Sequence, residues 1–471
     1  MATTPFQPRL PSWPAAALIA LCLSCASYPE RTAEAYDAFR SGQFDTAIEL
    51  YADPEVTGGE FLAGSEAGTV ALAAGDWDRA LAEFDRAARR VKEHEDRALV
   101  SAEAAAEQLG GFLLNESQLP YVGEGYERVL LHASLALVYL ARGDVEGLWV
   151  ETRRANRLLE TEEALYAKQY AAGGLAHFLS ALAYEMLDEP DNALIDYRRM
   201  LEKGVGEDLA GRAFVRVAER LGRLEDFPEW AERFGPPQEM APGAAAVVLV
   251  AGLGLAPQKR EASLTLPTPW GIARFAVPEL KASGGAEPAL TLELIDAGLA
   301  VQSTVLEDVE RVMAENLSDR VGWLALRSVA RAALRMAARE QLRKEVGIGA
   351  ALLADVFTLV AERADLRSWT TLPAQFHAAR AFVPAGVHGL VLRRAGASYD
   401  LGRFELLPGE TLIVLARGVG ARLHAYPIGG GRLDALPVFT DLATDGEAVS
   451  SDAPGVAVPA PVPSPAPSDQ P

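Results

Sequence analysis

A turn sequence that returns at regular spacing is the feature that most constrains the fold of this chain. Gly42-Gln43-Phe44-Asp45 is followed by Ala47-Ile48, and Gly75-Asp76-Trp77-Asp78 is followed by Ala80-Leu81, so the two glycines stand 33 residues apart. A third copy begins at Gly143, about two repeat lengths further on, and a degenerate fourth copy begins at Asp188 and contains Ala193-Leu194. A sequence that repeats at this length indicates a supersecondary unit stacked on copies of itself.

The residues on either side of each turn indicate paired helices. Small residues such as Ala67 and Gly68 precede Gly75, and Ala80 and Phe84 follow it at helical spacing. Small residues let paired helices approach closely, and stacked pairs bury faces that one pair leaves exposed. The pattern resembles tetratricopeptide repeats, which have a period of about 34 residues. A generic helical bundle with the same periodicity is the alternative.

The pattern changes near residue 243. Two proline- and glycine-rich breaks, at 235–237 and 242–243, cannot continue a helix, and a valine-rich apolar run follows at 244–255. Later apolar runs flank short Pro/Gly turns, which are hairpin signals. We therefore predict an α+β chain in which tetratricopeptide-like helical repeats over 25–235 precede a β-sandwich-like domain over 243–428.

An inserted helical segment and a tail complete the predicted architecture. Residues 306–346 are amphipathic and residues 348–361 are apolar, so a helical insertion is expected at about 306–361. From residue 429 the periodicity fades, and 458–471 is rich in Pro, Ala and Ser, which predicts a disordered tail over 429–471.

The N-terminus predicts export followed by lipid attachment. Arg9 precedes an apolar run that ends at Cys25 and is shorter than the roughly 20 residues of a membrane span. Residues 1–24 therefore read as a signal peptide. Leu23 and Ser24 resemble the bacterial lipobox, after which the cysteine is acylated and becomes the new N-terminus, although Cys22 stands where Leu or Val is usual. The alternatives are an ordinary signal peptide and a retained anchor.

Cleavage before Cys25 would also determine the cysteine content and the net charge of the mature chain. The sequence has two cysteines, so only the lipid-bearing one would remain, and neither a disulfide nor a cysteine-based metal site could form. The net charge is −21, and it becomes −22 when Arg9 is removed. Such a chain is repelled by nucleic acids and by anionic lipid surfaces. We expect no nucleic-acid partner, and we expect the N-terminal lipid alone to hold the protein at a membrane.

Catalytic and cofactor motifs are missing from the sequence. It contains no phosphate-binding Gly-x-x-x-x-Gly-Lys loop, no His-Glu-x-x-His zinc helix and no Gly-x-Ser-x-Gly elbow. The six histidines are scattered along the chain. We therefore predict a protein that is not an enzyme and has no catalytic residue, metal or cofactor. A hydrolase would need a histidine and a carboxylate or serine to converge in the fold.

The first of three polar clusters spans two predicted helices on either side of the third turn. These residues either form ion pairs between helices or line a repeat groove that binds an acidic tail. The cluster contains Glu127, Arg128, Glu151, Arg153, Arg154 and Asn156.

The other two clusters lie in or next to the predicted insertion. Five arginines at four-residue spacing make one basic helix face, which is either solvated or grips an anionic polymer or lipid head groups. Asp365, Arg367 and Trp369 follow in the sequence. They form either a carbohydrate- or peptide-binding edge or a hinge lock in which Trp369 plugs the sandwich. The five arginines are Arg327, Arg331, Arg335, Arg339 and Arg343.

Several of these segments resemble an uncharacterised family of bacterial lipoproteins with a tetratricopeptide-like N-terminal half. The similarity runs from about residue 30 to 428, and Gly147-Leu148-Trp149 departs from the alanine-rich helix expected there. The resemblance implies a location but no reaction. Ala26 and Ser27 lack the Asp associated with inner-membrane retention, so an outer-membrane, periplasm-facing protein is expected. The segments are 123–128, 141–144, 151–156, 254–257, 364–369 with 372–374, and 384–388.

Two functions follow from these expectations. The first is a lipid-anchored scaffold that binds envelope proteins through its helical repeats, in polysaccharide export or at the cell wall. The alternative is a protein that binds glycan or peptidoglycan, such as cell-wall or exported polysaccharide, through the β domain around Trp369 and the arginine stripe.

Overall fold

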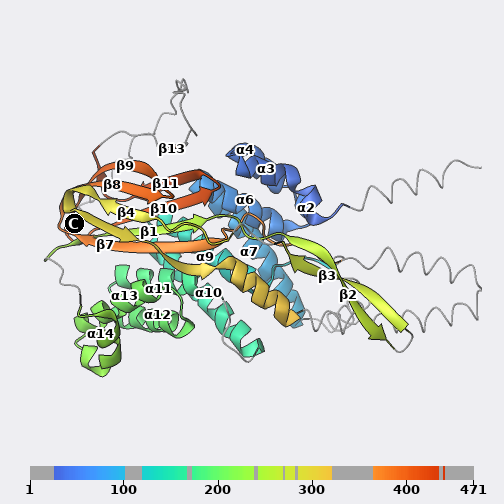
Figure 1. Cartoon of the computed structure of the whole chain (residues 1–471), viewed down its shortest axis with the longest axis horizontal. Coiled ribbons are helices and arrows are strands. Elements are labelled where there is room, and N and C mark those ends of the chain that lie inside the picture. Colours follow the sequence, from blue (N-terminus) through green and yellow to red (C-terminus); the bar gives the residue numbers. More distant parts are fainter. Residues whose placement is uncertain are drawn as a thin grey trace, which may run out of the picture.

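The computed structural model shows helices in the N-terminal half and strands in the C-terminal half, so the chain is an α+β protein (Figure 1). Cys25, the arginine stripe and most of the predicted insertion lie outside the described residues. Among the helices that are described, none is long and apolar enough to cross a membrane. The structure describes residues 26–100, 119–166, 172–237, 242–268, 271–281, 285–320, 364–433 and 439–440.

Helices over residues 28–234 pack mainly against their neighbours along the chain, in pairs such as α6 with α7 and α9 with α10. Two short 3-10 helices, η2 (Leu224–Asp226) and η3 (Ile295–Ala297), also occur. The helices are α2 (Tyr28–Arg31), α3 (Ala33–Arg40), α4 (Phe44–Tyr51), α5 (Pro54–Thr57), α6 (Glu60–Ala74), α7 (Trp77–Val100), α9 (Gly125–Ala141), α10 (Val145–Tyr166), α11 (Gly174–Met186), α12 (Pro190–Lys203), α13 (Glu207–Arg220) and α14 (Pro228–Phe234).

The predicted turn motif has the same backbone conformation in each copy. Its first residue ends a helix in the left-handed region, which glycine adopts without strain. The residue five positions later is fully buried against the neighbouring helices. These features fit stacked helix pairs, and the tetratricopeptide type stays a prediction. The turn residues are Gly42, Gly75, Gly143 and, in the degenerate copy, Asp188, and the buried residues are Ala47, Ala80, Leu148 and Ala193.

Within the described ranges, the strands form two stacked sheets and one separate ribbon. The six-stranded sheet has the order β13-β11-β10-β1-β7-β6, the five-stranded sheet has the order β12-β9-β8-β4-β5, and β2 pairs only with β3 in a ribbon that projects from the body (Figure 1). The strands are β1 (Ala245–Leu253), β2 (Lys259–Thr268), β3 (Gly271–Leu280), β4 (Thr291–Leu294), β5 (Leu299–Gln302), β6 (Thr304–Asp308), β7 (Gln375–Val383), β8 (Gly386–Arg394), β9 (Ala397–Leu406), β10 (Thr411–Val419), β11 (Arg422–Ile428), β12 (Gly431–Arg432) and β13 (Phe439–Thr440).

Strand β1 lies at the centre of three layers. It runs parallel to β10 and antiparallel to β7, and both of its faces are buried. Val247 and Leu249 belong to the core between the two sheets, whereas Val248 and Val250 belong to the core shared with the helices. A strand buried on both faces needs apolar residues at every position, which explains the unbroken valine-rich run.

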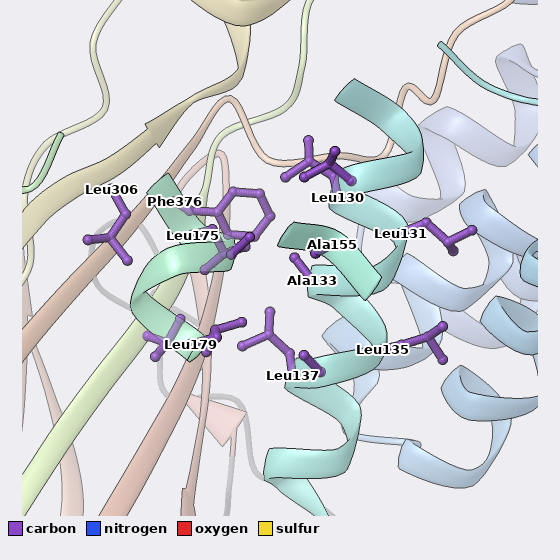
Figure 2. Close-up of a cluster of buried hydrophobic side chains, with 14 of the residues drawn as sticks. Leu130, Leu131, Ala133, Leu135, Leu137, Ala155, Leu175, Leu179, Leu306 and Phe376 are labelled. Atoms are coloured by element: carbon purple, nitrogen blue, oxygen red, sulfur yellow. The ribbon is translucent and has the colours of Figure 1, made fainter. Parts of the chain in front are cut away.

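The helices rest on the six-stranded sheet through a single apolar core. Figure 2 shows Leu130 and Leu137 of α9 and Leu175 of α11 beside Leu306 of β6 and Phe376 of β7, and all five are buried in one cluster. The chain's own sheet therefore covers this face of the helices, so the face is not an open repeat groove.

Two predicted boundaries differ from the structure. Residues 306–308 belong to β6, and the helix after it begins at Val309. The predicted tail contains β12 and β13, which pair with β9 and β11 respectively. Both strands have two residues, too few to show an alternating pattern, and their main-chain pairing does not require one.

A candidate binding cleft between the two halves

Two of the predicted polar clusters meet at one cleft of about 300 Å³. One wall is the loop and first turn that lead into α9, and the opposite wall is the segment that returns to β7. The β2–β3 ribbon, α10 and the helix beginning at Val309 complete it. The lining residues are Leu119, Pro120, Tyr121, Val122, Gly123, Glu124, Gly125, Arg128, Glu162, Lys259, Pro278, Asn316, Leu317, Arg320, Asp365 and Arg367.

Ion pairs line this cleft. Glu124 accepts hydrogen bonds from Lys259 Nζ at 2.6 Å and lies 2.8 Å from Arg320 Nη1. Arg128 Nη2 donates to Glu162 Oε1 at 2.9 Å across the neighbouring helices. The Lys259 and Glu162 side chains are 5% and 6% exposed, respectively. The cleft is thus walled by charged groups that are largely removed from water.

The sequence at the start of α9 builds this wall. Glu124 is the N-cap residue, and its main-chain N–H donates to Glu127 Oε2 at 2.9 Å in a capping box. The next residue, Gly125, has to be glycine, because a Cβ atom there would lie 2.3 Å from the Glu162 carboxylate. The absence of that atom lets Glu162 sit against the first turn of the helix, where Arg128 reaches it.

Residues 367–371, which we call the strap, are held by two buried glutamates. The Trp369 N–H donates to Glu127 Oε1 at 2.8 Å, and the Thr370 and Thr371 N–H groups donate to the two oxygens of Glu66 at 2.7 and 2.8 Å. Burial raises the pKa of both glutamates, and hydrogen bonds from the strap work against that rise. The helical half therefore binds the main chain of the β half directly.

Trp369 is an internal anchor of the strap. Its side chain is 1% exposed, its Nε1 donates to Thr69 Oγ1 at 2.9 Å, and its ring lies 5.9 Å from that of Phe84. The predicted lock is therefore placed among the helices, and the prediction that Trp369 plugs the sandwich is wrong. A ring buried to this extent presents no face to a sugar, so Trp369 cannot be the proposed glycan-binding surface.

Arg367 and Asp365 form the part of the third cluster that reaches the cleft. The Arg367 guanidinium donates to both Asp365 oxygens, at 2.9 and 2.7 Å, and lies 5.0 Å from the centre of the Tyr121 ring. Burial works to raise the pKa of Asp365, but the hydrogen bonds and charge of Arg367 hold it below its usual value.

The remaining members of the first cluster lie away from the cleft. Glu151 accepts from Arg154 Nη1 at 2.6 Å and contacts His132 Nδ1 at 2.7 Å, while Arg153 stacks over the Trp149 ring. Asn156 Nδ2 donates towards Ser180 and Asp196 on the next helix pair. Glu151 and Asn156 thus join helices, as the structural interpretation of the cluster predicts, whereas the Arg154–Glu151 pair lies within α10.

The structure also reveals a repeated buried pair that sequence reasoning missed. His177 Nδ1 lies 2.8 Å from Asp196 and His132 lies 2.7 Å from Glu151, and in each case 19 residues separate the partners. Each carboxylate follows its turn residue, Asp188 or Gly143, by the same number of positions. This fixed offset was the signal available in the sequence. It places an acidic residue at the same position in the second helix of two successive helix pairs.

Arg417 is another functional-site neighbour that the sequence did not single out. Its guanidinium lies beneath the strap, beside a small cavity of about 50 Å³. It donates to four main-chain oxygens, and burial lowers its pKa to about 9 although the charge of Glu287 opposes this. It thus fixes the strap to the ends of β1 and β10. The four acceptors belong to Gly252, Gly254, Gly418 and Thr371.

A serine and a histidine do meet in the β half. Ser303 Oγ lies 3.2 Å from His377 Nδ1, and it also accepts a hydrogen bond from the Leu290 N–H at 2.9 Å. Both side chains are buried. The arrangement holds the corner where the chain passes from β5 to β6. Within the described ranges, no group of three or more His, Cys, Asp or Glu residues is placed to hold a metal ion.

Comparison with known proteins adds no relative. No protein-family model matches this chain, and no curated protein resembles it significantly. The resemblance to a lipoprotein family therefore stays a prediction, and the cleft has to be interpreted from its own geometry.

Proposed function

We propose that this chain is a lipid-anchored, non-enzymatic component of the bacterial outer membrane that faces the periplasm and binds another envelope component at the cleft. The observation that carries the proposal is the convergence of two segments. The helical segment containing Glu127 and the strap containing Trp369 are separated by 242 residues and together form the cleft walls.

The energetics of the cleft favour a binding role. Buried ion pairs contribute little to stability, because the cost of desolvating the charges offsets most of their attraction. Apolar residues in the same place often give a fold that is equally stable. Here such pairs surround open volume instead of filling it. Perturbed or buried charges beside a cavity are typical of functional sites, and about 300 Å³ lies at the lower end of the range of small-molecule sites.

The fold also directs a partner towards this cleft. The face of the helices formed by residues such as Leu137 and Leu175 is filled by the sheet, so no partner can use it. A protein partner remains the first candidate and a glycan the second. The second candidate is supported by the hydrogen-bonding groups of the cleft, and Trp369 has no part in it because it is buried.

A photo-crosslinking amino acid can test the cleft in living cells. Leu317 lines the cleft, whereas Ala314 is exposed on the same helix and is not part of the lining. We expect a specific crosslinked product from position 317 that is absent from position 314 and is lost in an Arg320→Glu variant. Equal labelling at both positions, or none at position 317, would contradict a binding cleft.

The anchor is tested separately with the Cys25→Ser variant. We expect wild-type protein to incorporate a labelled fatty acid and to fractionate with the outer membrane, and the variant to do neither. A Cys25→Ser protein that is processed and anchored normally would rule out the proposed attachment.

A further inference from the structure

We infer that the cleft binds a saccharide that carries a carboxylate, and that Arg320 recognises this carboxylate. The inference rests on the proposed function of the cleft, takes the second of its two candidate partners, a glycan, and names the ligand class. Among the described residues, four cationic side chains line the cleft against three anionic ones, in a chain whose net charge is −21. The cleft is thus a local region where an anionic group is attracted to an otherwise repelling protein.

Arg320 is the most exposed of the three arginines that line the described part of the cleft. Its side chain is 35% exposed, compared with 24% for Arg128 and 10% for Arg367. Its partner Glu124 also pairs with Lys259 Nζ at 2.6 Å. A ligand carboxylate can therefore attract Arg320 without leaving Glu124 as an uncompensated buried charge.

Arg128 and Arg367 hold more deeply buried parts of the walls. Arg128 neutralises Glu162, which is 6% exposed, and Arg367 holds Asp365 and donates to the Leu119 carbonyl at 2.9 Å. Moving either side chain would leave a buried carboxylate without its partner.

The polar groups in the lining favour a saccharide over an apolar peptide segment. Glu162, Asp365, Asn316 and Lys259 present both donors and acceptors to the cleft. Sugar hydroxyls donate and accept, so they can join such a network at many points. An apolar peptide side chain would cover the same groups without hydrogen bonds, which is costly for buried polar atoms.

The test is a calorimetric titration of the full-length protein in detergent. The probes are a disaccharide ending in glucuronate, the matched neutral disaccharide ending in glucose, and a tripeptide with a free C-terminal carboxylate. The variants are Arg320→Met, Arg320→Lys and, as a matched control on the same helix, Arg311→Met. Arg311 pairs with Glu315 and lies outside the lining.

We expect the glucuronate probe to bind best and Arg320→Met to weaken it roughly tenfold to a hundredfold, as for loss of a charge-assisted hydrogen bond. Arg320→Lys should recover part of the affinity, and Arg311→Met should bind as the wild type does. The inference is overturned if the neutral sugar binds equally well, if the tripeptide binds instead, or if no probe binds. Crosslinking at Leu317 alongside any of those results would leave the proposed cleft standing without this ligand class.

Discussion

His377 should make the folded protein less stable in mild acid. Burial, followed by the charge of Arg394, lowers the pKa of His377 from 6.5 to about 4, and Asp308 only partly opposes this. Because the folded pKa lies below the unfolded one, the unfolded chain takes up the proton first as the pH falls. The stability that neutral His377 provides is therefore complete above about pH 6.5 and is lost between pH 6.5 and about 4.

The size of this effect follows from the two pKa values. The difference between 6.5 and about 4 corresponds to about 3 kcal/mol, at about 1.4 kcal/mol for each pKa unit. Glu66, Glu127 and Glu307 act in the opposite sense because burial raises their pKa values. For these three groups the folded state binds protons first, so acidification stabilises it. Only a comparison with a His377 variant isolates the histidine.

The assay is urea unfolding of the wild type and the His377→Asn variant from pH 8 to pH 4.5. The variant should be less stable at pH 7 to 8, where the difference between the two proteins is constant and serves as the control. Below pH 6.5 that difference should shrink by about 1.4 kcal/mol for each pH unit. A difference that stays the same from pH 8 to pH 4.5 would refute the assigned burial of an uncharged histidine.

Three further substitutions test the strap and the cleft, each by chemical or thermal unfolding. Glu66→Ala removes the acceptor of two strap N–H groups and should cost about 2–6 kcal/mol, at about 1–3 kcal/mol for each buried N–H left without a partner, and a loss below 1 kcal/mol would contradict its role. Gly125→Ala should lower both the melting temperature and ligand affinity because the new Cβ meets Glu162; unchanged affinity would argue against the first turn of α9 as a cleft wall. Arg417→Met should destabilise by about 3 kcal/mol because four carbonyl oxygens lose their donor, and a neutral result would show that water replaces it.

Local features of the fold could be predicted because their causes are local. The glycine at each helix turn has a left-handed conformation, and the helix pairs on either side of it pack together. The valine-rich run of β1 is likewise explained by a strand buried on both faces. In each case the signal lies within a short stretch of sequence.

The cleft could be predicted only in part, because its walls meet through tertiary contacts. Sequence reasoning selected Arg128, Asp365 and Arg367, which do line it, but placed them in separate clusters. It did not find Lys259 or Glu162, since nothing adjacent in sequence marks either residue. The role of Trp369 in the sandwich was also wrong, because its partners Thr69 and Phe84 lie 300 and 285 positions earlier in the chain.

Buried carboxylates explain why the two halves can form one binding site. Glu66 and Glu127 of the helical half accept strap N–H groups, and Glu307 of β6 accepts the Gly173 N–H at the start of α11 at 2.8 Å. Each contact joins a carboxylate of one half to the main chain of the other, so it constrains the backbone itself. The walls contributed by α9 and by the strap are consequently fixed relative to each other before a ligand arrives. A preformed site loses less conformational freedom on binding, which favours binding of the small acidic sugar that we propose.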